Sequence, residues 1–242
     1  SRGVCEVVLY TPQHNTTLTN LNVEHIKLLI DLWTERYREL GGRDYVKYVF
    51  IFENKGREIG VTLDHPHGQI YAFPFTPPRI ERELSSSRQY WKRTGECLFC
   101  RIMDKERRNG SRIICENDRF ICFLPFFARW PYGVHIYPKR HIQSLLDLSY
   151  EDRLAFAQIL KVVLTKFDNL LAISFPYMMV LHQKPTDGKD YSYYHFHVEF
   201  YPPYREKGKL KFFASVETGA GTVTFDYRPE DKADELRRSP GG

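Results

Sequence analysis

The stretch Asp64-His65-Pro66-His67-Gly68-Gln69-Ile70 organises the rest of the chain. It follows Phe52-Glu53-Asn54-Lys55-Gly56 and leads into the apolar run Tyr71-Ala72-Phe73-Pro74-Phe75. We expect the imidazoles of His65 and His67 to face opposite sides of an extended segment, so that one is held structurally while the other meets a substrate. This division of roles between the two histidines predicts a catalytic site on this stretch.

The composition is that of a globular protein with a substantial core. The chain has 242 residues, of which 42% are hydrophobic and 15% aromatic, which is enough for one large domain or two small ones. Its 35 Lys and Arg residues exceed its 30 Asp and Glu residues, but they are spread along the sequence. Nucleic-acid-binding proteins usually concentrate their basic residues on one face. We therefore expect phosphorylated small molecules as ligands and no nucleic acid.

No segment of the sequence predicts membrane insertion or secretion. Every apolar stretch is shorter than the roughly 20 residues that a membrane-spanning helix needs, and no secretory signal opens the chain. Five cysteines, an odd number in such a chain, argue against a disulfide framework. We expect a cytoplasmic protein in which Cys5, Cys115 and Cys122 are reduced core residues.

Hydrophobic periodicity predicts strands mixed with long helices. Apolar residues at helical spacing predict a helix over 23–40 with Asn22 as its N-cap, and Ser149 with Asp152 resembles a capping box for a helix through Leu170. A charged connector helix is predicted over 79–93, with a short helix or turn over 97–107. Runs of β-branched and aromatic residues predict strands over 4–10, 45–52, 68–75, 111–115, 119–124, 133–137, 177–181 and 194–200.

The second part of the chain repeats the order of the first. A short strand, a proline and His141 match the strand, proline and His14 near the start, and His195-Phe196-His197-Val198-Glu199 stands where 65–69 stood. Such self-similarity indicates an internal duplication. We predict an α+β fold of two similar halves, each an antiparallel sheet carrying one long helix, with the first half incomplete at its N-terminus.

A metal site is predicted in the second half. Cys97 and Cys100 form a C-x-x-C, whose spacing places two thiolates on one side of a metal, and the repeat independently selects His141 and His195. Two thiolates and two imidazoles suit Zn²⁺, and four protein ligands indicate a structural site rather than a catalytic one. The alternative is a pair of reduced thiols near unrelated histidines.

The first half supplies the predicted catalytic residues. By the same repeat, His14 and His65 are half of a first metal site, whose cysteines are expected upstream. His67 then stays free to attack phosphorus, because a neutral imidazole is both a nucleophile and a leaving group near neutral pH. Gln69 can hydrogen-bond a phosphoryl oxygen without exchanging a proton, which favours a nucleotidyl-histidine intermediate over hydrolysis. The alternative for His67 is a hydrogen-bonded core histidine.

Several motifs along the whole chain support a family resemblance. The most specific is the pentapeptide 65–69 with Glu53-Asn54-Lys55-Gly56 upstream. The others are Arg2-Gly3, Pro12-x-His14, Trp130-Pro131, Phe175-Pro176-Tyr177, Phe200-Tyr201-Pro202-Pro203 and Lys211-Phe212. Together they resemble the galactose-1-phosphate uridylyltransferase family of the histidine-triad superfamily. The resemblance implies two fused histidine-triad-like halves, usually in a homodimer whose active sites are completed across subunits.

The resemblance also implies ping-pong chemistry. UDP-glucose would give its uridylyl group to His67, glucose-1-phosphate would leave, and galactose-1-phosphate would take the group. Gln69 would steady the α-phosphoryl group, and Asn54 and Thr62 match positions that contact phosphates in the family. The segment that contacts the sugar, in the partner's site, would supply Lys211, Val216 and Glu217.

Domain boundaries and a second metal set follow from the same resemblance. We expect 1–78 to be the C-terminal part of the first half, 79–95 a connector helix and 96–242 the second half, with the N-terminal part of the family lacking. Some members place a second metal, such as iron, on four residues that match Glu83, His182, His197 and Glu199, the last replacing an expected histidine. We favour zinc on the cysteine set, because thiolates at this spacing suit zinc.

Other functions stay open on the sequence alone. A related nucleotidyltransferase, such as an ADP-glucose or dinucleotide phosphorylase, would use the same His67 with another base or acceptor. A non-catalytic, zinc-stabilised nucleotide-binding fragment would result if His14 and His65 lacked metal partners and left His67 badly oriented. A nucleic-acid-processing histidine-triad protein fits the diffuse charge poorly.

Overall fold

The computed structural model describes residues 2–242 and contains one eight-stranded sheet, in the order β1-β3-β2-β7-β8-β6-β5-β4. Neighbouring strands are antiparallel throughout. The predicted strands are present, at Val4–Leu9 (β1), Tyr48–Lys55 (β2), His67–Phe73 (β3), Ile113–Glu116 (β4), Phe120–Phe123 (β5), His135–Pro138 (β6), Tyr177–His182 (β7) and His197–Tyr201 (β8). A small hairpin of β9 (Tyr204–Glu206) and β10 (Lys209–Leu210) stands outside this sheet.

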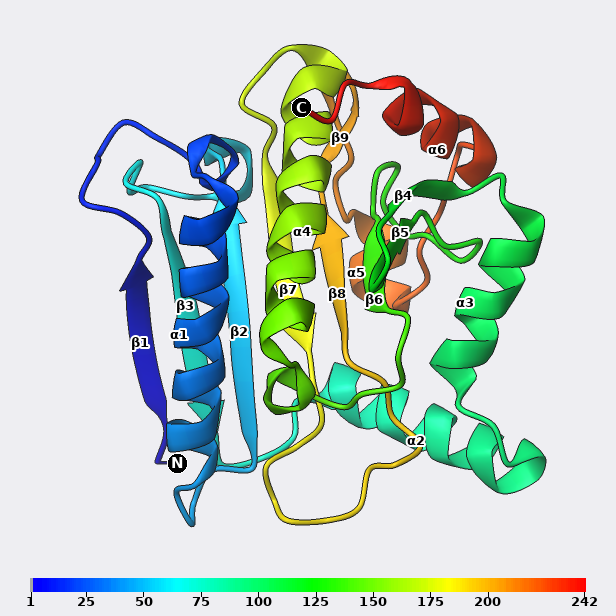
Figure 1. The fold of residues 1–242 in the computed structure, drawn as a ribbon. Coiled ribbons are helices and arrows are strands. Elements are labelled where there is room, and N and C mark those ends of the chain that lie inside the picture. Colours follow the sequence, from blue (N-terminus) through cyan, green and yellow to red (C-terminus); the bar gives the residue numbers. More distant parts are fainter. Residues whose placement is uncertain (1) are drawn as a thin grey trace.

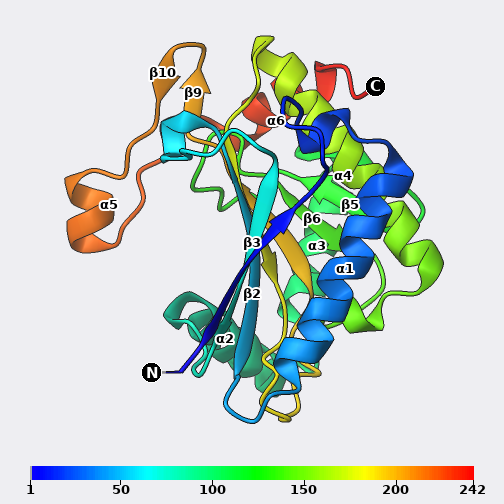
Figure 2. The same ribbon diagram turned by 90° about the vertical axis from the view of Figure 1, so that its left-hand side faces the viewer.

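Two long helices cover one face of the sheet, α1 (Val23–Gly41) and α4 (Tyr150–Leu171) (Figures 1 and 2). The N-cap of α1 is Asn22, whose side chain accepts a hydrogen bond from the backbone N–H of His25 at 2.8 Å. At the start of α4, Ser149 and Asp152 form the predicted capping box. Both helix starts are therefore confirmed, because each depends on local hydrogen bonds that the sequence encodes.

The opposite face is covered mainly over the second half. Figure 2 shows α2 (Pro78–Thr94) on the side of the sheet away from α1, and α3 (Leu98–Asn109) packs with it against Tyr137 and Phe123. Two further helices that the sequence patterns do not predict are α5 (Ser215–Ala220) and α6 (Pro229–Arg238). Three short 3₁₀ helices lie at Leu18–Asn20, Arg57–Ile59 and Leu145–Asp147.

The two halves are related as the repeat predicts. In the sheet, β1-β3-β2 with α1 corresponds to β6-β8-β7 with α4. The structure adds that the halves share one continuous sheet, because β2 pairs with β7 from Ile51 opposite Leu181 to Lys55 opposite Tyr177. The predicted α+β fold of two antiparallel halves is confirmed. None of the helices in residues 2–242 combines the length and the apolar character needed to cross a bilayer.

The sheet face opposite α1 remains partly open in the first half. There the rings of Phe50, Phe52, Tyr71 and Phe73 are half-buried and pack on one another. Cys5 points to this open face, opposite Tyr71 in the strand register, and is exposed. The prediction that Cys5 is a core residue is therefore wrong, whereas Cys122 is buried and Cys115 half-buried.

Candidate functional site

His67 is the first residue of β3 and lies on the open face of the sheet, half-buried. Its Nδ1 is 2.8 Å from the backbone carbonyl oxygen of His65. A carbonyl oxygen only accepts hydrogen bonds, so Nδ1 carries the proton and the neutral ring keeps its lone pair on Nε2. The backbone therefore fixes which nitrogen of His67 is nucleophilic.

The side chains of His65 and His67 point in different directions because of a bend in the backbone before β3, and not because side chains alternate along a strand. Residues two apart on a strand share a face, so the reason given for opposite orientations is wrong. His65 lies in the bend before β3, where its Nε2 donates to the carbonyl oxygen of Thr11 at 2.8 Å. Its Nδ1 lies 3.0 Å from the Nδ1 of His14. The two histidines thus have different partners, as the predicted division of roles requires.

A cavity of about 340 Å³ opens beside His67, with Asn54 and the loop 55–58 in its walls. Lys55 anchors this region through an ion pair with Asp168 at 2.8 Å. Thr62 lies on the neighbouring loop, between two lining residues, but is exposed and outside the cavity wall. Gln69 follows His67 on the same face of β3, and its Oε1 accepts a hydrogen bond from the Tyr71 hydroxyl at 3.0 Å.

The four ligands predicted for the second-half metal converge in the structure. The donor atoms of Cys97, Cys100, His141 and His195 all lie within 4.8 Å of one another. The Sγ of Cys100 is 3.3 Å from Nδ1 of His141 and 3.4 Å from Nδ1 of His195. The outward Nε2 atoms donate to the carbonyl oxygens of Ser192, at 2.9 Å, and Pro138, at 3.0 Å. This second layer of hydrogen bonds aims both Nδ1 lone pairs at the thiols, as metal-binding histidines require.

The charge state of the cysteine pair also fits a cation. The hydrogen bond from the Cys100 thiol lowers the pKa of the Cys97 thiol to about 2, against the effect of burial. The hydrogen bond to Cys97, together with burial and the charge of Cys97, raises the pKa of the Cys100 thiol. Without a cation the pair therefore carries one negative charge, whereas a bound dication would favour two thiolates.

The first half contains a matching pair of histidines. The Nδ1 atoms of His14 and His65 face each other as those of His141 and His195 do, and the Nε2 of His65 meets a backbone carbonyl as that of His195 does. Two lone pairs at 3.0 Å favour a cation or a proton between them. Within residues 2–242, no third Cys, Asp, Glu or His joins this pair.

The residues predicted to contact the sugar belong to one segment, and none of them lines the His67 cavity. Figure 2 shows the segment with β10 and α5 projecting from the body of the protein. In it the buried Lys211 donates to the carbonyl oxygen of Thr224 and lies 4.0 Å from Glu217. Glu217 accepts from the backbone N–H and the hydroxyl of Thr224, at 3.2 Å and 2.7 Å. Val216 is exposed and precedes Glu217 in α5. The three residues therefore belong to one segment.

Sequence comparison assigns both halves to one family. Residues 1–77 match the N-terminal domain of galactose-1-phosphate uridyl transferase, and residues 83–222 match its C-terminal domain. The chain belongs to the galactose-1-phosphate uridylyltransferase family. It is therefore a transferase.

Relatives of this family match nearly the whole chain. The galactose-1-phosphate uridylyltransferase of Thermotoga maritima is 48% identical over 240 residues, which are 99% of this chain and 75% of the relative. That of Haemophilus influenzae is 35% identical over 98% of this chain and 67% of its own length.

Solved structures of the family superpose closely. A structure described as a uridylyltransferase has a TM-score of 0.93 and 41% identity, and covers 98% of this chain and 75% of its own. An ADP-glucose phosphorylase from Arabidopsis thaliana, solved with bound ADP-glucose, has a TM-score of 0.87 and 25% identity over 98% of this chain and 73% of its own. These matches confirm the resemblance that the motifs indicated.

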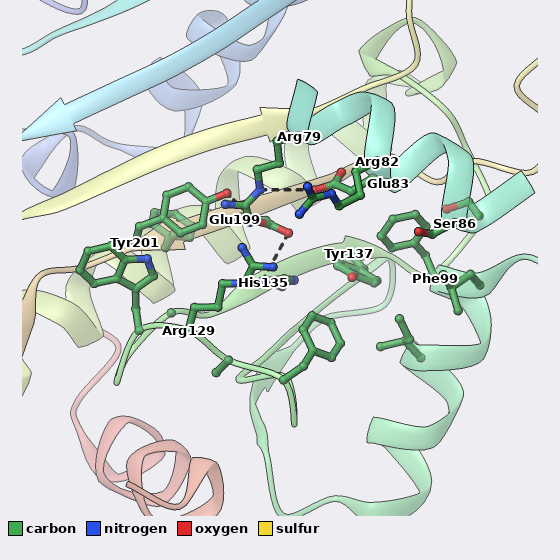
Figure 3. Close-up of a pocket in the computed structure, with 18 of the residues that line it drawn as sticks. Arg79, Arg82, Glu83, Ser86, Phe99, Arg129, His135, Tyr137, Glu199 and Tyr201 are labelled. Carbon is green, nitrogen blue, oxygen red and sulfur yellow. Dashed lines mark hydrogen bonds and ion pairs between the residues drawn. The ribbon is translucent and has the colours of Figure 1, made fainter. Parts of the chain in front are cut away.

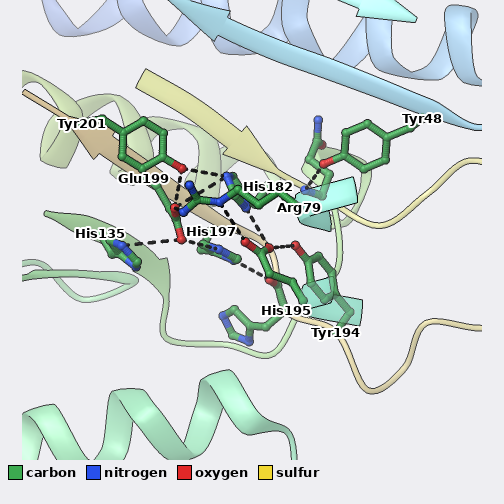
Figure 4. A network of polar contacts seen from close by, with 11 residues as sticks. Tyr48, Arg79, His135, His182, Tyr194, His195, His197, Glu199 and Tyr201 are labelled. Carbon is green, nitrogen blue, oxygen red and sulfur yellow. Dashed lines mark hydrogen bonds and ion pairs between the residues drawn. The ribbon is translucent and has the colours of Figure 1, made fainter. Parts of the chain in front are cut away.

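The structure also assembles the second metal set implied by the family (Figure 4). The donor atoms of Glu83, His182, His197 and Glu199 lie within 4.8 Å of one another, and Figure 4 labels the last three. The Nε2 of His197 is buried without a hydrogen-bond partner in the described chain, which suits a metal ligand. However, Arg79 places a guanidinium 2.7 Å from Glu199 and 3.5 Å from Glu83. The set therefore already contains a positive charge of its own.

Protonation balances the remaining charges of this set. Burial opposes ionisation of both carboxyl groups, but His182 lowers the pKa of Glu83, and His135 and His182 lower that of Glu199. Burial alone would lower the pKa of His182, but the carboxylates of Glu83, at 2.9 Å, and Glu199 outweigh burial, so that the pKa is raised overall. The network can thus be neutral without a metal. The zinc-type set and this set share no residue, and the structure brings each together.

Glu53 is the residue of this family site that sequence reasoning missed. It lines the His67 cavity but is 3% exposed, and it accepts hydrogen bonds from Tyr177 at 3.1 Å and Tyr10 at 3.3 Å. Burial raises the pKa of Glu53 to about 7, although Lys55 and the two hydroxyls oppose the rise. The available signal was a carboxylate inside the apolar run of β2, where a charge is costly.

Proposed function

We propose that this enzyme moves a uridylyl group from UDP-glucose to galactose-1-phosphate through a covalent bond to His67. One observation carries the proposal: the Nδ1–H of His67 is held by the His65 carbonyl at 2.8 Å, so that Nε2 is the free nucleophile beside a cavity. The names of the relatives supply galactose-1-phosphate and the uridylyl group, and UDP-glucose is the donor that the family resemblance implies.

The reaction is a double displacement at the α-phosphorus. The Nε2 lone pair of His67 attacks phosphorus, and the bond to the glucose-1-phosphate oxygen breaks, with the electron pair leaving on that oxygen. In the second step an oxygen of galactose-1-phosphate attacks the same phosphorus and the N–P bond breaks, which returns a neutral imidazole. The His65 carbonyl stabilises the positive ring between these steps.

Gln69 is proposed to hold the phosphoryl group. Its Oε1 already accepts from the Tyr71 hydroxyl, which leaves the amide NH₂ as the end available to a phosphoryl oxygen. An amide cannot take or give a proton here, so it supplies no general acid or base to activate water. Asn54, in the cavity wall, and Thr62, on the adjacent loop, are proposed to contact phosphates.

We propose a homodimer in which Lys211, Val216 and Glu217 contact the sugar in the partner's site. The projecting segment supports this role, because the Lys211 and Glu217 contacts stiffen it without tying it to its own His67. We retain 1–78, 79–95 and 96–242 as the boundaries of the first half, the connector and the second half. All five cysteines are free, which fits the reducing cytoplasm that we propose as its location.

Zinc is the proposed ion of the Cys97, Cys100, His141 and His195 set, where it would have a structural role. Two soft thiolates and two oriented imidazoles support this choice. His14 and His65 are proposed ligands of a first-half metal. Iron on the Glu83 set is less favoured, because Arg79 already neutralises part of its charge.

A second candidate is an ADP-glucose phosphorylase, since one similar structure carries that name and ligand. Both candidates use His67, so the nucleotide decides between them. Incubation with UDP-glucose or ADP-glucose, followed by intact-mass measurement, tests the proposal. We expect a uridylyl adduct that His67→Asn abolishes; an adenylyl adduct alone would favour the second candidate, and no adduct from either would refute both.

A further inference from the structure

A second cavity, of about 490 Å³, lies between α2, α3 and the strands of the second half (Figure 3). It shares no lining residue with the His67 cavity. Its size falls within the roughly 300–1,000 Å³ of small-molecule sites. Its walls include residues from α2, α3, β6, β8 and the loop 127–130.

Three buried polar atoms of this wall have no hydrogen-bond partner in the described chain. They are Oγ of Ser87, Nδ1 of His135 and the hydroxyl oxygen of Tyr137, and the three side chains belong to residues that are 0%, 7% and 0% exposed. Buried polar groups are almost always hydrogen-bonded, because burying them without a partner is costly. The wall of this cavity therefore holds three polar groups whose hydrogen-bonding capacity is unused in the described chain.

The mouth of the cavity is positively charged. Arg82 and Arg129 line it, are exposed, and form no ion pair with any carboxylate in residues 2–242. Arg79, by contrast, is committed to Glu199 and Glu83. Two uncommitted guanidinium groups match the geometry and charge of a phosphate.

The remaining wall is aromatic. Phe99 and Phe127 line the cavity, as does Trp130, whose ring stacks on Phe213 with centroids 4.5 Å apart. Flat apolar surfaces of this kind suit a planar ring that also carries polar groups at its edge. A phosphate at the two arginines and a planar ring between the aromatic side chains together describe a nucleotide.

We propose that this cavity binds a nucleoside monophosphate without reacting with it. The second-half counterpart of His67 is His197, whose Nδ1 meets the His195 carbonyl at 2.9 Å as that of His67 meets the His65 carbonyl. However, His197 is fully buried, lies outside the cavity wall, and has its Nε2 3.4 Å from Glu199. A bound phosphate therefore lacks the counterpart of His67 beside it. This binding does not depend on transfer at His67.

Fluorescence of Trp130 tests the proposal in the purified protein, with UMP as the probe. The cavity signal is the part of the UMP-induced change in emission that Trp130→Phe removes, since Trp33 and Trp91 do not line this cavity. We expect this signal to saturate, and the double variant Arg82→Gln/Arg129→Gln to raise its Kd by roughly tenfold or more, because charge-assisted hydrogen bonds to phosphate are lost.

The matched control is Arg107→Gln/Arg108→Gln, which removes the same charge from two exposed residues of α3 outside the cavity. It should leave the Kd unchanged, and circular dichroism should show all variants folded. The proposal is overturned if UMP produces no Trp130-dependent change, if both double variants bind alike, or if inorganic phosphate competes as well as UMP. Failure to label His67 would alter none of these outcomes.

Discussion

A backbone carbonyl and one neighbouring side chain distinguish the two related histidines of this protein. His67 and His197 make the same Nδ1 contact to a carbonyl two residues earlier. His67 is half-buried and is followed on its face by neutral Gln69, whereas His197 is buried beside the Glu199 carboxylate. The Glu199 carboxylate lies 3.4 Å from Nε2 of His197. Its negative charge would repel a phosphoryl group at that nitrogen. The difference between Gln69 and Glu199 therefore fits reaction in the first half only.

The protonation of Glu53 gives a pH-dependent prediction. Its folded pKa, about 7, lies above the unfolded value near 4.5, so the folded state binds more protons and stability falls as pH rises between these values. Glu53→Gln removes this penalty. Between pH 5 and pH 8 the parent should lose about 2–3 kcal/mol in free energy of unfolding that the variant does not lose.

Urea denaturation at both pH values measures this change. Glu35→Gln, at an exposed position of α1, is the matched control and should follow the parent across the same range. A Glu53→Gln curve that runs parallel to the parent curve would show that Glu53 ionises normally in the folded protein.

At the scale of elements, the ring of Tyr10, just after β1, packs closely against Gly68 in β3. A Cβ at Gly68 would lie 2.3 Å from the hydroxyl oxygen of Tyr10, which itself bonds Glu53. The glycine of the 65–69 motif therefore has a packing reason, since real Cβ atoms do not approach so closely. The same ring links the start of β3 to the wall of the His67 cavity.

Gly68→Ala should destabilise the protein by about 1–3 kcal/mol, because overpacking forces Tyr10 to shift. In a Tyr10→Phe background the nearest clashing atom is absent, so the cost of the same substitution should be smaller. Thermal unfolding of the four proteins of this cycle measures both effects. Gly219→Ala, where an added Cβ meets nothing within 4 Å, should be close to neutral; an equal loss at both glycines would contradict the account.

The sequence predicts individual helices and strands better than it predicts which strands pair. The caps at Asn22 and Ser149 were predictable because their partners lie within three residues. The pairing of β2 with β7 links residues more than a hundred positions apart, and both strands are apolar enough to pair with many others. No pattern in either strand selects that partner.

At the scale of the molecule, the internal repeat made the cysteine set predictable. His141 and His195 were selected by position relative to His14 and His65, and the fold brings them to Cys97 and Cys100. The cavity lined by Ser87, His135 and Tyr137 was not predictable in this way. It forms only when α2 and α3 pack onto the second-half sheet, and nothing near these residues in the sequence indicates that their polar atoms lack partners.

Removal of one cysteine should separate metal content from general stability. We expect the protein to hold tightly bound zinc that Cys100→Ser largely loses, with a fall in Tm of roughly 10 °C because metal binding contributes to folding. Cys115→Ser, at a half-buried cysteine outside the set, is the control and should retain the zinc. Equal zinc content in both variants, measured by atomic emission, would exclude the set as the binding site.

The position of the uridylyl group on the imidazole tests the central claim most directly. Protein labelled with ¹⁵N-histidine, exposed to UDP-glucose without acceptor, can be examined by phosphorus–nitrogen coupling in NMR. Because the His65 carbonyl holds Nδ1, we predict a single adduct on Nε2 of His67. An adduct on Nδ1, an adduct on another residue such as His197, or no adduct would contradict the account.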